Sequence, residues 1–401
     1  MRSKALGLIL IALLLGNGAL AAGQAQTREE PSYTFKTLHS FTGGNDGCGI
    51  YGGLARDRSG SLYGVAYLSD CYSGGSVLFK LTHTKQGYRF RVLETFSSVN
   101  RLCDSTPAVD KAGNVFGVCK GGVSNEGTLW EYSSKGKLTV LHSFNGPGDG
   151  MEPEDSVVLD ASGNIYGTTY TWGPGGSGTL WEYSPSSKSF KLLHGFSDGD
   201  DGGLLPAGPN VDPDGVVWGT TEDGPNCYYC GDGTAWNYDP SSGTFTTVVD
   251  FNSTGILAPQ SRTVFGKEGN VFGTAFGTSG GYNNCGLVYE LQKANNYAPV
   301  VAYPFTGGDD GCLTYGRVRL DKHGHFLGTT YSGGSFGGGT VYELIHKNGA
   351  WQETTLHSFN YSDGSGSQAG MVTDHKGSWF GTTSGGGKYG WGTVFEISGV
   401  K

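Results

Sequence analysis

The stretch Asp160-Ala-Ser-Gly-Asn-Ile-Tyr-Gly-Thr-Thr169 decides the fold of this chain, because variants of it occur six more times. The glycine after its aromatic residue recurs at positions 64, 117, 167, 219, 273, 328 and 381, so the spacing is 50 to 55 residues. A steady period of this length is the signature of a repeat architecture. The chain therefore contains seven copies of one supersecondary unit.

Each copy contains two further sequence motifs. One is Gly-Thr-apolar-aromatic-Glu, as in Gly178–Glu182, and the other resembles Leu141-His-Ser-Phe144. Together with the strands on either side of the Asp-x-x-Gly turn, they give about four short strands per copy, which is the content of one propeller blade. We place the strand that ends at the Asp innermost and the Leu-His-Ser-Phe strand outermost. The sequence predicts an all-β, seven-bladed β-propeller.

The two ends of the repeat region complement each other. Residues 33–41 read as an outermost strand, whereas the last copy stops at residues 392–397 with a third strand. Pairing these two segments would complete one blade and leave no exposed sheet edge. We therefore predict that the N-terminal and C-terminal strands close the ring.

Composition excludes several classes of protein. The chain has 72 Gly but only 14 Pro among 401 residues, 12% aromatic residues and a formal net charge of -9. This composition fits many short strands joined by glycine turns and does not fit a disordered chain. Because no basic run is present, we expect no nucleic-acid partner.

The N-terminus predicts export. Arg2 and Lys4 precede an apolar stretch from Ala5 to Leu15, and small residues follow, so residues 1–22 read as a signal peptide. Residues 23–32 form a short linker and residues 33–398 the propeller. Since no second apolar segment follows, we expect no membrane span in the mature chain. The predicted product is a monomer that is extracellular or periplasmic.

The sequence of the repeat resembles that of the tandem-repeat family of GloVer-containing proteins. Its units are similar to Ser-Phe-x-Gly-x-Asp-Gly, then Asp-x-x-Gly-Asn-aromatic-Tyr-Gly-Thr-Thr, then Gly-Gly-Gly-Thr-Val-Phe-x-Leu, and the resemblance covers roughly residues 38–397. It implies a cell-surface or secreted protein but no defined activity. Members often carry a C-terminal anchoring signal, whereas this sequence stops at Lys401 soon after its last strand, so the expectation of surface anchoring is weakened and both retention at the surface and release stay open.

The eight cysteines predict disulfides, because an exported protein folds in an oxidising compartment. All of them fall in or beside loops of one propeller face. We expect four pairs: Cys48–Cys71, Cys103–Cys119, Cys227–Cys230 and Cys285–Cys312. The alternative for Cys227 and Cys230 is a redox or metal half-site, but a second pair of ligands is missing.

Acidic glycine loops lie on the same face. Only the loop with Asp198, Asp200 and Asp201 brings three carboxylates close together in sequence, so calcium is the metal to consider there. No cofactor is required by the pattern. The alternative is that these residues form ordinary turns, because Asp before Gly bonds nearby backbone amides. His39, His142, His194 and His357 share one repeat position on separate blades, which favours packing between blades over a metal cluster.

Departures from the repeat mark a candidate ligand site at the mouth of the central channel. Four residues before the turn Asp, blades five and six carry Arg262 and Arg317, whereas the other blades carry small residues, and Arg319 follows closely. Paired guanidinium groups hold a carboxylate or sulfate well. Their alternative role is a salt bridge to an acidic neighbour such as Asp155. Further ligand-binding candidates, which break the repeat pattern, are Trp172, Tyr228 and Tyr229.

No motif for a catalytic nucleophile, a zinc protease or a phosphate loop is present. The sequence therefore favours a secreted, non-catalytic recognition protein whose partner is an extracellular polysaccharide, another anionic ligand or a surface protein. Two alternatives remain open: an extracellular carbohydrate-active hydrolase or lyase, and a purely structural envelope protein. Fold alone does not separate them.

Overall fold

The computed structural model describes residues 33–68, 75–96, 102–121, 126–153, 156–204, 207–224, 231–278 and 285–399. The chain divides into two units, 1–32 and 33–401, so the predicted signal peptide and linker lie outside the described residues. Within the described ranges, no helix is long and apolar enough to cross a membrane. All the strands described here belong to the second unit.

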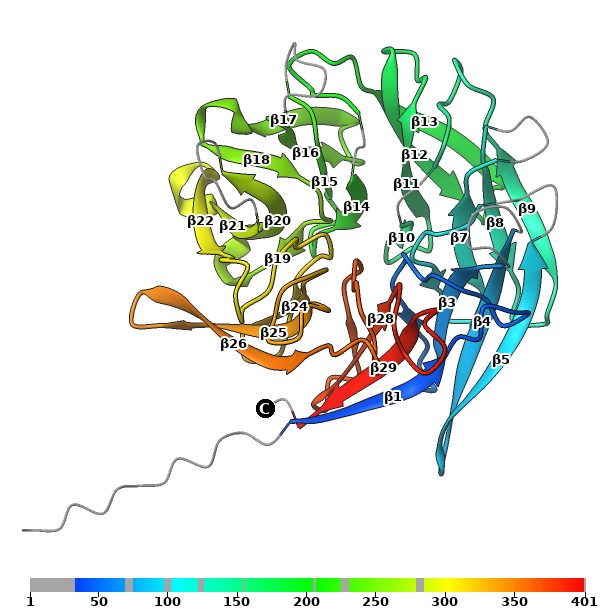
Figure 1. Ribbon diagram of the computed structural model, residues 1–401. Helices are drawn as coiled ribbons and strands as arrows, with labels where there is room; N and C mark the ends of the chain where they lie inside the picture. Colours follow the sequence, from blue (N-terminus) through cyan, green and yellow to red (C-terminus); the bar gives the residue numbers. More distant parts are fainter. Residues whose placement is uncertain are drawn as a thin grey trace, which may run out of the picture. The chain divides into compact units, whose positions relative to one another are not determined.

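Seven antiparallel sheets form the blades of a ring, as the repeats predict (Figure 1). Blade one contains β2 (Ala55–Arg56), β3 (Leu62–Tyr67), β4 (Ser76–Thr84) and β5 (Gly87–Phe96). Blade two contains β6 (Ala108–Val109), β7 (Val115–Cys119), β8 (Thr128–Tyr132) and β9 (Leu138–Ser143). Blade three contains β10 (Val158–Leu159), β11 (Ile165–Thr171), β12 (Ser177–Ser184) and β13 (Ser189–Gly195). Blade four contains β14 (Ala207–Val211), β15 (Val217–Thr221), β16 (Thr234–Asp239) and β17 (Thr244–Asp250).

The remaining blades follow the same order from the innermost strand outward. Blade five contains β18 (Ile256–Pro259), β19 (Val264–Phe265), β20 (Val271–Thr278), β21 (Leu287–Gln292) and β22 (Ala298–Pro304). Blade six contains β23 (Arg319–Leu320), β24 (Phe326–Thr329), β25 (Thr340–Lys347) and β26 (Ala350–Ser358). Blade seven contains β27 (Val372–Thr373), β28 (Ser378–Thr383), β29 (Thr393–Ser398) and β1 (Thr34–Ser40). Three short 3-10 turns are η1 (Phe251–Ser253), η2 (Lys267–Gly269) and η3 (Lys293–Asn295).

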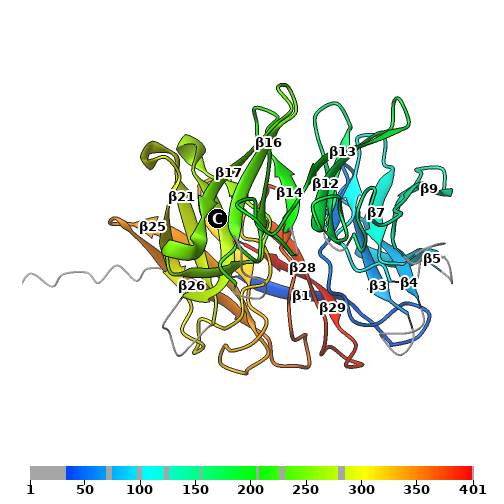
Figure 2. The same cartoon turned by 90° about the horizontal axis from the view of Figure 1, so that it is seen from above.

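The ring closes between the first and last strands. Strand β1 pairs antiparallel with β29 from Thr34 opposite Ser398 to Ser40 opposite Thr393, and the two lie side by side in both ribbon views (Figures 1 and 2). Blade seven thus takes its outermost strand from the start of the repeat region. The predicted closure is confirmed.

Blade five departs from the four-strand expectation. Its innermost position holds two short strands, β18 and β19, which both pair with β20. Strand β20 has eight residues, more than the second strand of any other blade, so β18 can pair along the part beyond β19. The turn after β19 also has Gly266 where six other copies have Asp. The irregular blade is therefore the one whose turn sequence is least typical.

The repeated glycine of each second strand is explained by the aromatic residue of the third strand. Gly219 lies under Trp236, and a Cβ atom added to that glycine would be 2.2 Å from the indole ring. The same arrangement occurs in all seven blades, with the nearest atom of the aromatic side chain 2.2–2.4 Å from the added Cβ. These aromatic side chains are fully buried, including Trp130 and Trp181. They form the blade core, as the sequence indicates, and stand in no position to bind a ligand.

The repeated histidines join neighbouring blades. Each ring stacks on a phenylalanine in the outermost strand of the next blade, with centroids 3.6–3.8 Å apart, and its Nε2 lies 2.6–3.1 Å from a carboxylate of the following acidic loop. We call each such group a His–Asp–Phe clip. The four clips are His39–Asp46–Phe90, His142–Asp149–Phe190, His194–Asp201–Phe245 and His357–Asp363–Phe35. Their role is packing between blades.

Candidate functional site

A polar cavity of about 440 Å³ opens where the innermost strands converge, and all seven blades contribute to it. We call it the channel-mouth pocket. Most of its wall comes from the loops that enter the innermost strands, which are the loops that contain or adjoin the cysteines. Its charged side chains are Asp104, Lys120, Glu222, Arg262 and Arg317. Three cations therefore face two carboxylates around one concave site.

Disulfides support this face of the propeller. Cys103 bonds Cys119, and each cysteine directly precedes a pocket residue, Asp104 and Lys120 respectively. The Lys120 Nζ lies 3.6 Å from the Asp104 Oδ2, which also accepts a 2.7 Å hydrogen bond from the Tyr67 hydroxyl. The disulfide therefore fixes one charged side of the pocket.

One of the three other predicted cysteine pairs can be seen in full in the described residues. Cys285 bonds Cys312 between blades five and six, as expected. Cys48 is also disulfide-bonded. Its expected partner Cys71 lies outside the described residues, and so do both members of the Cys227–Cys230 pair.

The two arginines of the sequence prediction both line the pocket. Arg262 is 7% exposed, and its Nε donates a 2.9 Å hydrogen bond to the carbonyl of Pro209 in the neighbouring blade. Arg317 passes over Gly370, where an added Cβ would lie 2.3 Å from the arginine Cγ. The small residue in blade seven is thus what allows the Arg317 side chain to take this path.

Glu222 adds a half-buried carboxyl group to the pocket lining, close in the fold to Arg262. Its Oε1 accepts a 3.1 Å hydrogen bond from the Gln260 side chain. Burial raises the pKa of Glu222, and the charge of Asp223 adds to this effect. Tyr315 lines the same cavity, and its pKa is raised by burial, by Tyr331 and by Glu222. Arginines, a tyrosine and a carboxyl group with a raised pKa thus share one pocket.

The remaining predicted ligand residues are not in this wall. Arg319 lies in β23, outside the pocket lining, and burial lowers the pKa of its guanidinium group. Trp172 is 59% exposed and has a left-handed backbone with φ of 63°. Tyr228 and Tyr229 lie outside the described residues. An aromatic shelf formed by these three residues stays a prediction.

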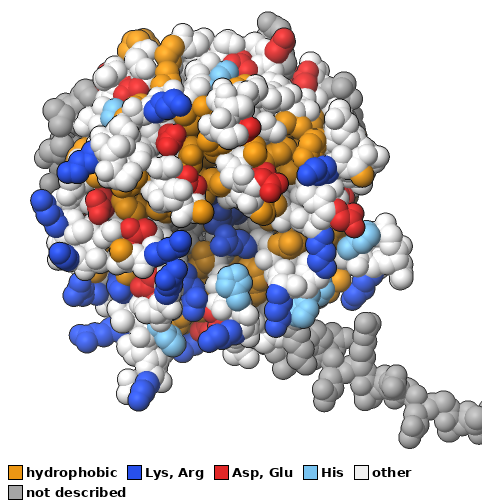
Figure 3. Space-filling view, turned by 180° about the vertical axis from the view of Figure 1, so that it is seen from behind, with side chains coloured by type: hydrophobic (Ala, Val, Ile, Leu, Met, Phe, Trp, Pro, Cys, Tyr) orange, Lys and Arg blue, Asp and Glu red, His pale blue; other side chains and the backbone are white. Residues whose placement is uncertain are grey.

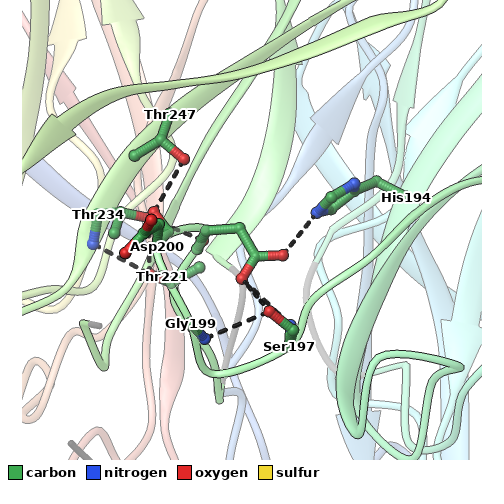
Figure 4. A network of polar contacts seen from close by, with 8 residues as sticks. His194, Ser197, Gly199, Asp200, Thr221, Thr234 and Thr247 are labelled. Atoms are coloured by element: carbon green, nitrogen blue, oxygen red, sulfur yellow. Dashed lines mark hydrogen bonds and ion pairs between the residues drawn. The ribbon is translucent and has the colours of Figure 1, made fainter. Parts of the chain in front are cut away.

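The acidic loop at 198–202 acts as a turn between blades three and four (Figure 4). The Asp201 carboxylate accepts from the Ser197 hydroxyl at 2.7 Å and lies 2.9 Å from the His194 Nε2. The carbonyls of Asp200 and Asp201 accept from Thr247 and Thr234 at 3.0 and 3.1 Å. Turn formation thus accounts for Asp201, and calcium binding by Asp198, Asp200 and Asp201 stays an untested prediction.

Sequence reasoning missed several aromatic residues near the pocket. Tyr51 and Tyr315 line it, and the ring of Tyr315 meets that of Tyr331 edge-on at 5.8 Å. Further exposed aromatics lie in the glycine-rich loops of blades six and seven: Phe336, Tyr361, Tyr389 and Trp391. Their signal was present in the sequence, because each is an aromatic residue in a loop where the repeat requires only glycine and small residues.

The surface carries charges of both signs. On the face drawn in Figure 3, Lys and Arg side chains alternate with Asp and Glu, and basic side chains reach into a hollow near the centre. The net charge of the chain is -9. Basic side chains thus gather in the lower part of this view, although the chain as a whole is acidic.

The family of this chain follows from its repeats. The family model of the Gloeobacter/Verrucomicrobia repeat matches residues 108–279 and 230–400, which is more than half of the chain. The chain belongs to this repeat family. The resemblance noted in the sequence is thereby confirmed, and the structure shows that in this member seven repeats form seven blades. No curated protein matches the sequence.

Several solved structures have a similar fold. PorZ, a surface component of the type-IX secretion system of Porphyromonas gingivalis, has a TM-score of 0.56 and 14% identity over 90% of this chain and 48% of PorZ. An extracellular domain of a one-component system from B. thetaiotaomicron has a TM-score of 0.54 and 13% identity, over 92% of this chain and 42% of the other. The repeat-family protein thus spans less than half of either chain, and at these identities the likeness shows the propeller fold alone.

Proposed function

We propose that this repeat-family propeller is an exported recognition protein that binds an acidic saccharide in the channel-mouth pocket. The single observation that carries the proposal is the placement of Arg262 and Arg317 in one polar, concave site. Paired guanidinium groups suit a carboxylate or sulfate, and buried ligand pockets typically combine a few polar groups with aromatic walls. Tyr51 and Tyr315 provide such walls.

Export is part of the proposal. Disulfides persist in oxidising compartments, and the described cysteines are all bonded. Two of the similar structures are an extracellular domain and a surface component, which is the setting we propose for this chain as well. The polar lining argues against a purely structural role, because a propeller that served only as a building block would more simply fill its channel with apolar side chains.

The test is a calorimetric titration of the oxidised mature protein with an oligogalacturonate. We expect Arg317→Gln to weaken binding about 10- to 100-fold, which is the range for one charge-assisted contact. Arg317→Lys should weaken binding less, because the charge remains while the forked geometry is lost. Lys135→Gln removes the same charge at an exposed position outside the pocket and is the matched control.

Equal binding by the wild type, Arg317→Gln and Lys135→Gln would show that the saccharide binds elsewhere. Gly370→Ala gives an independent check, because its Cβ would displace the Arg317 side chain without changing any charge. It should weaken binding in the same direction as Arg317→Gln. Circular dichroism and thermal unfolding of each variant would separate lost binding from lost folding.

A second candidate is a hydrolase or lyase for the same saccharide. The observation that favours it is Glu222, whose raised pKa suits a general acid and which lies with Tyr315 in the wall that holds the arginines. In that case the wild type would shorten the oligogalacturonate, and Glu222→Gln would bind it without cleaving it. Mass spectrometry of the saccharide after incubation distinguishes the enzyme from the binding protein.

A further inference from the structure

A second cluster of ligating side chains lies away from the channel-mouth pocket, at the turn between β23 and β24 of blade six. It contains Asp321, His325 and Glu343, whose ligand atoms all lie within 4.8 Å of one another. Glu343 is 4% exposed, and the two other residues are half-buried. In the described part of the chain, no other group of three such side chains meets this distance.

Each carboxylate is held through one oxygen and presents the other to the same imidazole nitrogen. The Asp321 Oδ1 accepts hydrogen bonds of 2.8 Å from the amides of His323 and His325, while its Oδ2 lies 3.6 Å from the His325 Nδ1. The Glu343 Oε2 accepts a 3.4 Å hydrogen bond from Tyr33, and its Oε1 lies 3.1 Å from the same Nδ1. The backbone and Tyr33 thus orient the ligands before any ion arrives, as the outer partners in metal sites do.

The spacing suits a small divalent ion. Zinc bonds to nitrogen and oxygen are about 2.0–2.2 Å long, which puts neighbouring ligands of a tetrahedral site about 3.3 Å apart. The two distances from the His325 Nδ1, 3.1 and 3.6 Å, lie on either side of that value. An ion bound between the three groups would coordinate the Nδ1 atom in its unprotonated form.

Blade six is the one repeat that can form this cluster. At the His325 position, blades two, three and five have Asn, blades one and seven have Ser, and blade four has Val. In blades two and three the amide of Asn114 or Asn164 donates to the turn Asp at 2.8 or 3.0 Å. The turn thus forms with Asn, Ser or Val at this position, and histidine adds a metal ligand that the fold does not require.

We infer that Asp321, His325 and Glu343 form a site for a divalent transition metal ion of the zinc class. One imidazole and two carboxylates suit Zn²⁺ better than Ca²⁺, which prefers six to eight oxygen ligands. Three protein ligands leave a coordination position for water or an external donor. The exposed His323, on the same turn, has its ring centroid 5.9 Å from that of His325.

The experiment is equilibrium dialysis of the oxidised mature protein against Zn²⁺, with metal content measured by mass spectrometry. We expect one ion per chain in the wild type and at least a tenfold weaker site in His325→Asn. This variant reproduces the Asp, Asn and Glu set of blades two and three, so it should fold. Conversely, Asn164→His recreates the cluster in blade three with Asp160 and Glu182, and should add a second ion.

Spectra of the Co²⁺-loaded protein give a readout of geometry. We expect the visible absorption of a tetrahedral site in the wild type, and its loss in His325→Asn and in Glu343→Gln. The inference is overturned if the wild type binds no Zn²⁺, or if His325→Asn binds it as tightly as the wild type. Glycan binding should be the same with and without Zn²⁺, so failure of this site and failure of the channel-mouth pocket can be told apart.

Discussion

At the residue scale, the close contact between Gly219 and Trp236 explains why every repeat needs this glycine. Gly219→Ala would place a methyl group 2.2 Å from the indole, so the ring or the strand must move. We expect a loss of about 1–3 kcal/mol in the free energy of unfolding, the usual cost of overpacking a core. Denaturant unfolding measures it. Gly308→Ala, at an exposed loop glycine with no contact shorter than 3.5 Å, should cost far less.

The carboxyl group of Glu353 should make the stability of the protein depend on pH. Burial raises the pKa of Glu353 to about 7, and the charge of Asp310 contributes. Between pH 4.5 and 7 the folded protein therefore binds more protons at this group than the unfolded chain does, so Glu353 lowers stability as pH rises. Glu353→Gln should stabilise the protein at pH 8 by about 1 kcal/mol, after solvent screening reduces the full value.

The corresponding measurement is thermal unfolding of the wild type and Glu353→Gln across this pH range. The difference between them should be near zero at acidic pH and grow toward pH 8. A constant difference at all pH values would mean that the pKa of Glu353 is the same in the folded protein and in the unfolded chain.

At the element scale, two of the four His–Asp–Phe clips make stability depend on pH in the opposite sense. Desolvation outweighs the nearby carboxylates and lowers the pKa of His39 and His357 below the ordinary value of 6.5. The unfolded chain therefore takes up protons first as pH falls below 6.5, so these clips lose stability in that window. The double variant His39→Gln with His357→Gln should unfold with a flatter pH profile between pH 7 and 5.

The control for this result is the absolute stability at pH 7.5. There the double variant should be less stable than the wild type, because the stacking on Phe90 and Phe35 is lost. If wild type and variant have parallel pH profiles, protonation of the clips does not contribute to acid unfolding.

Much of this element-scale detail could be predicted from the sequence. The repeat predicted the strand order, the innermost position of the Asp strand and two disulfides. It could do so because the same local sequence pattern occurs seven times along the chain. Arg262 and Arg317 could be found as departures from it. The extra strand β18 could not, since it depends on the length of β20 in that blade alone.

The sequence could not predict which residues meet in the channel-mouth pocket and in the Asp321 cluster. Tyr315 is two residues from Arg317 in the sequence, but Glu222 belongs to blade four, so it meets the arginines only through the packing of neighbouring blades. His325 and Glu343 are 18 residues apart, and their proximity depends on the register of β24 with β25. The sequence shows His325 where other blades have Asn. It does not show that Glu343 lies beside this histidine, because that depends on how the strands pair.

At the scale of the whole molecule, the β1–β29 pairing should control the stability of the entire ring. A protein that begins at residue 42 lacks β1 and leaves the outer edge of β29 unpaired. We expect a lower unfolding temperature and self-association through this edge, because unpaired strand edges recruit other strands. Thermal unfolding with size-exclusion chromatography measures both. A truncated protein that stays monomeric with the wild-type unfolding temperature would contradict closure as a source of stability.

The most direct test of the central claim compares an oligogalacturonate with its methyl ester, titrated into the oxidised mature protein by calorimetry. The two saccharides have the same rings, but only the first has the carboxylates that Arg262 and Arg317 would bind. We predict measurable binding of the acid that weakens with added salt, and at least tenfold weaker binding of the ester. Equal binding of both, or binding of neither, would contradict recognition of an acidic saccharide at the channel-mouth pocket.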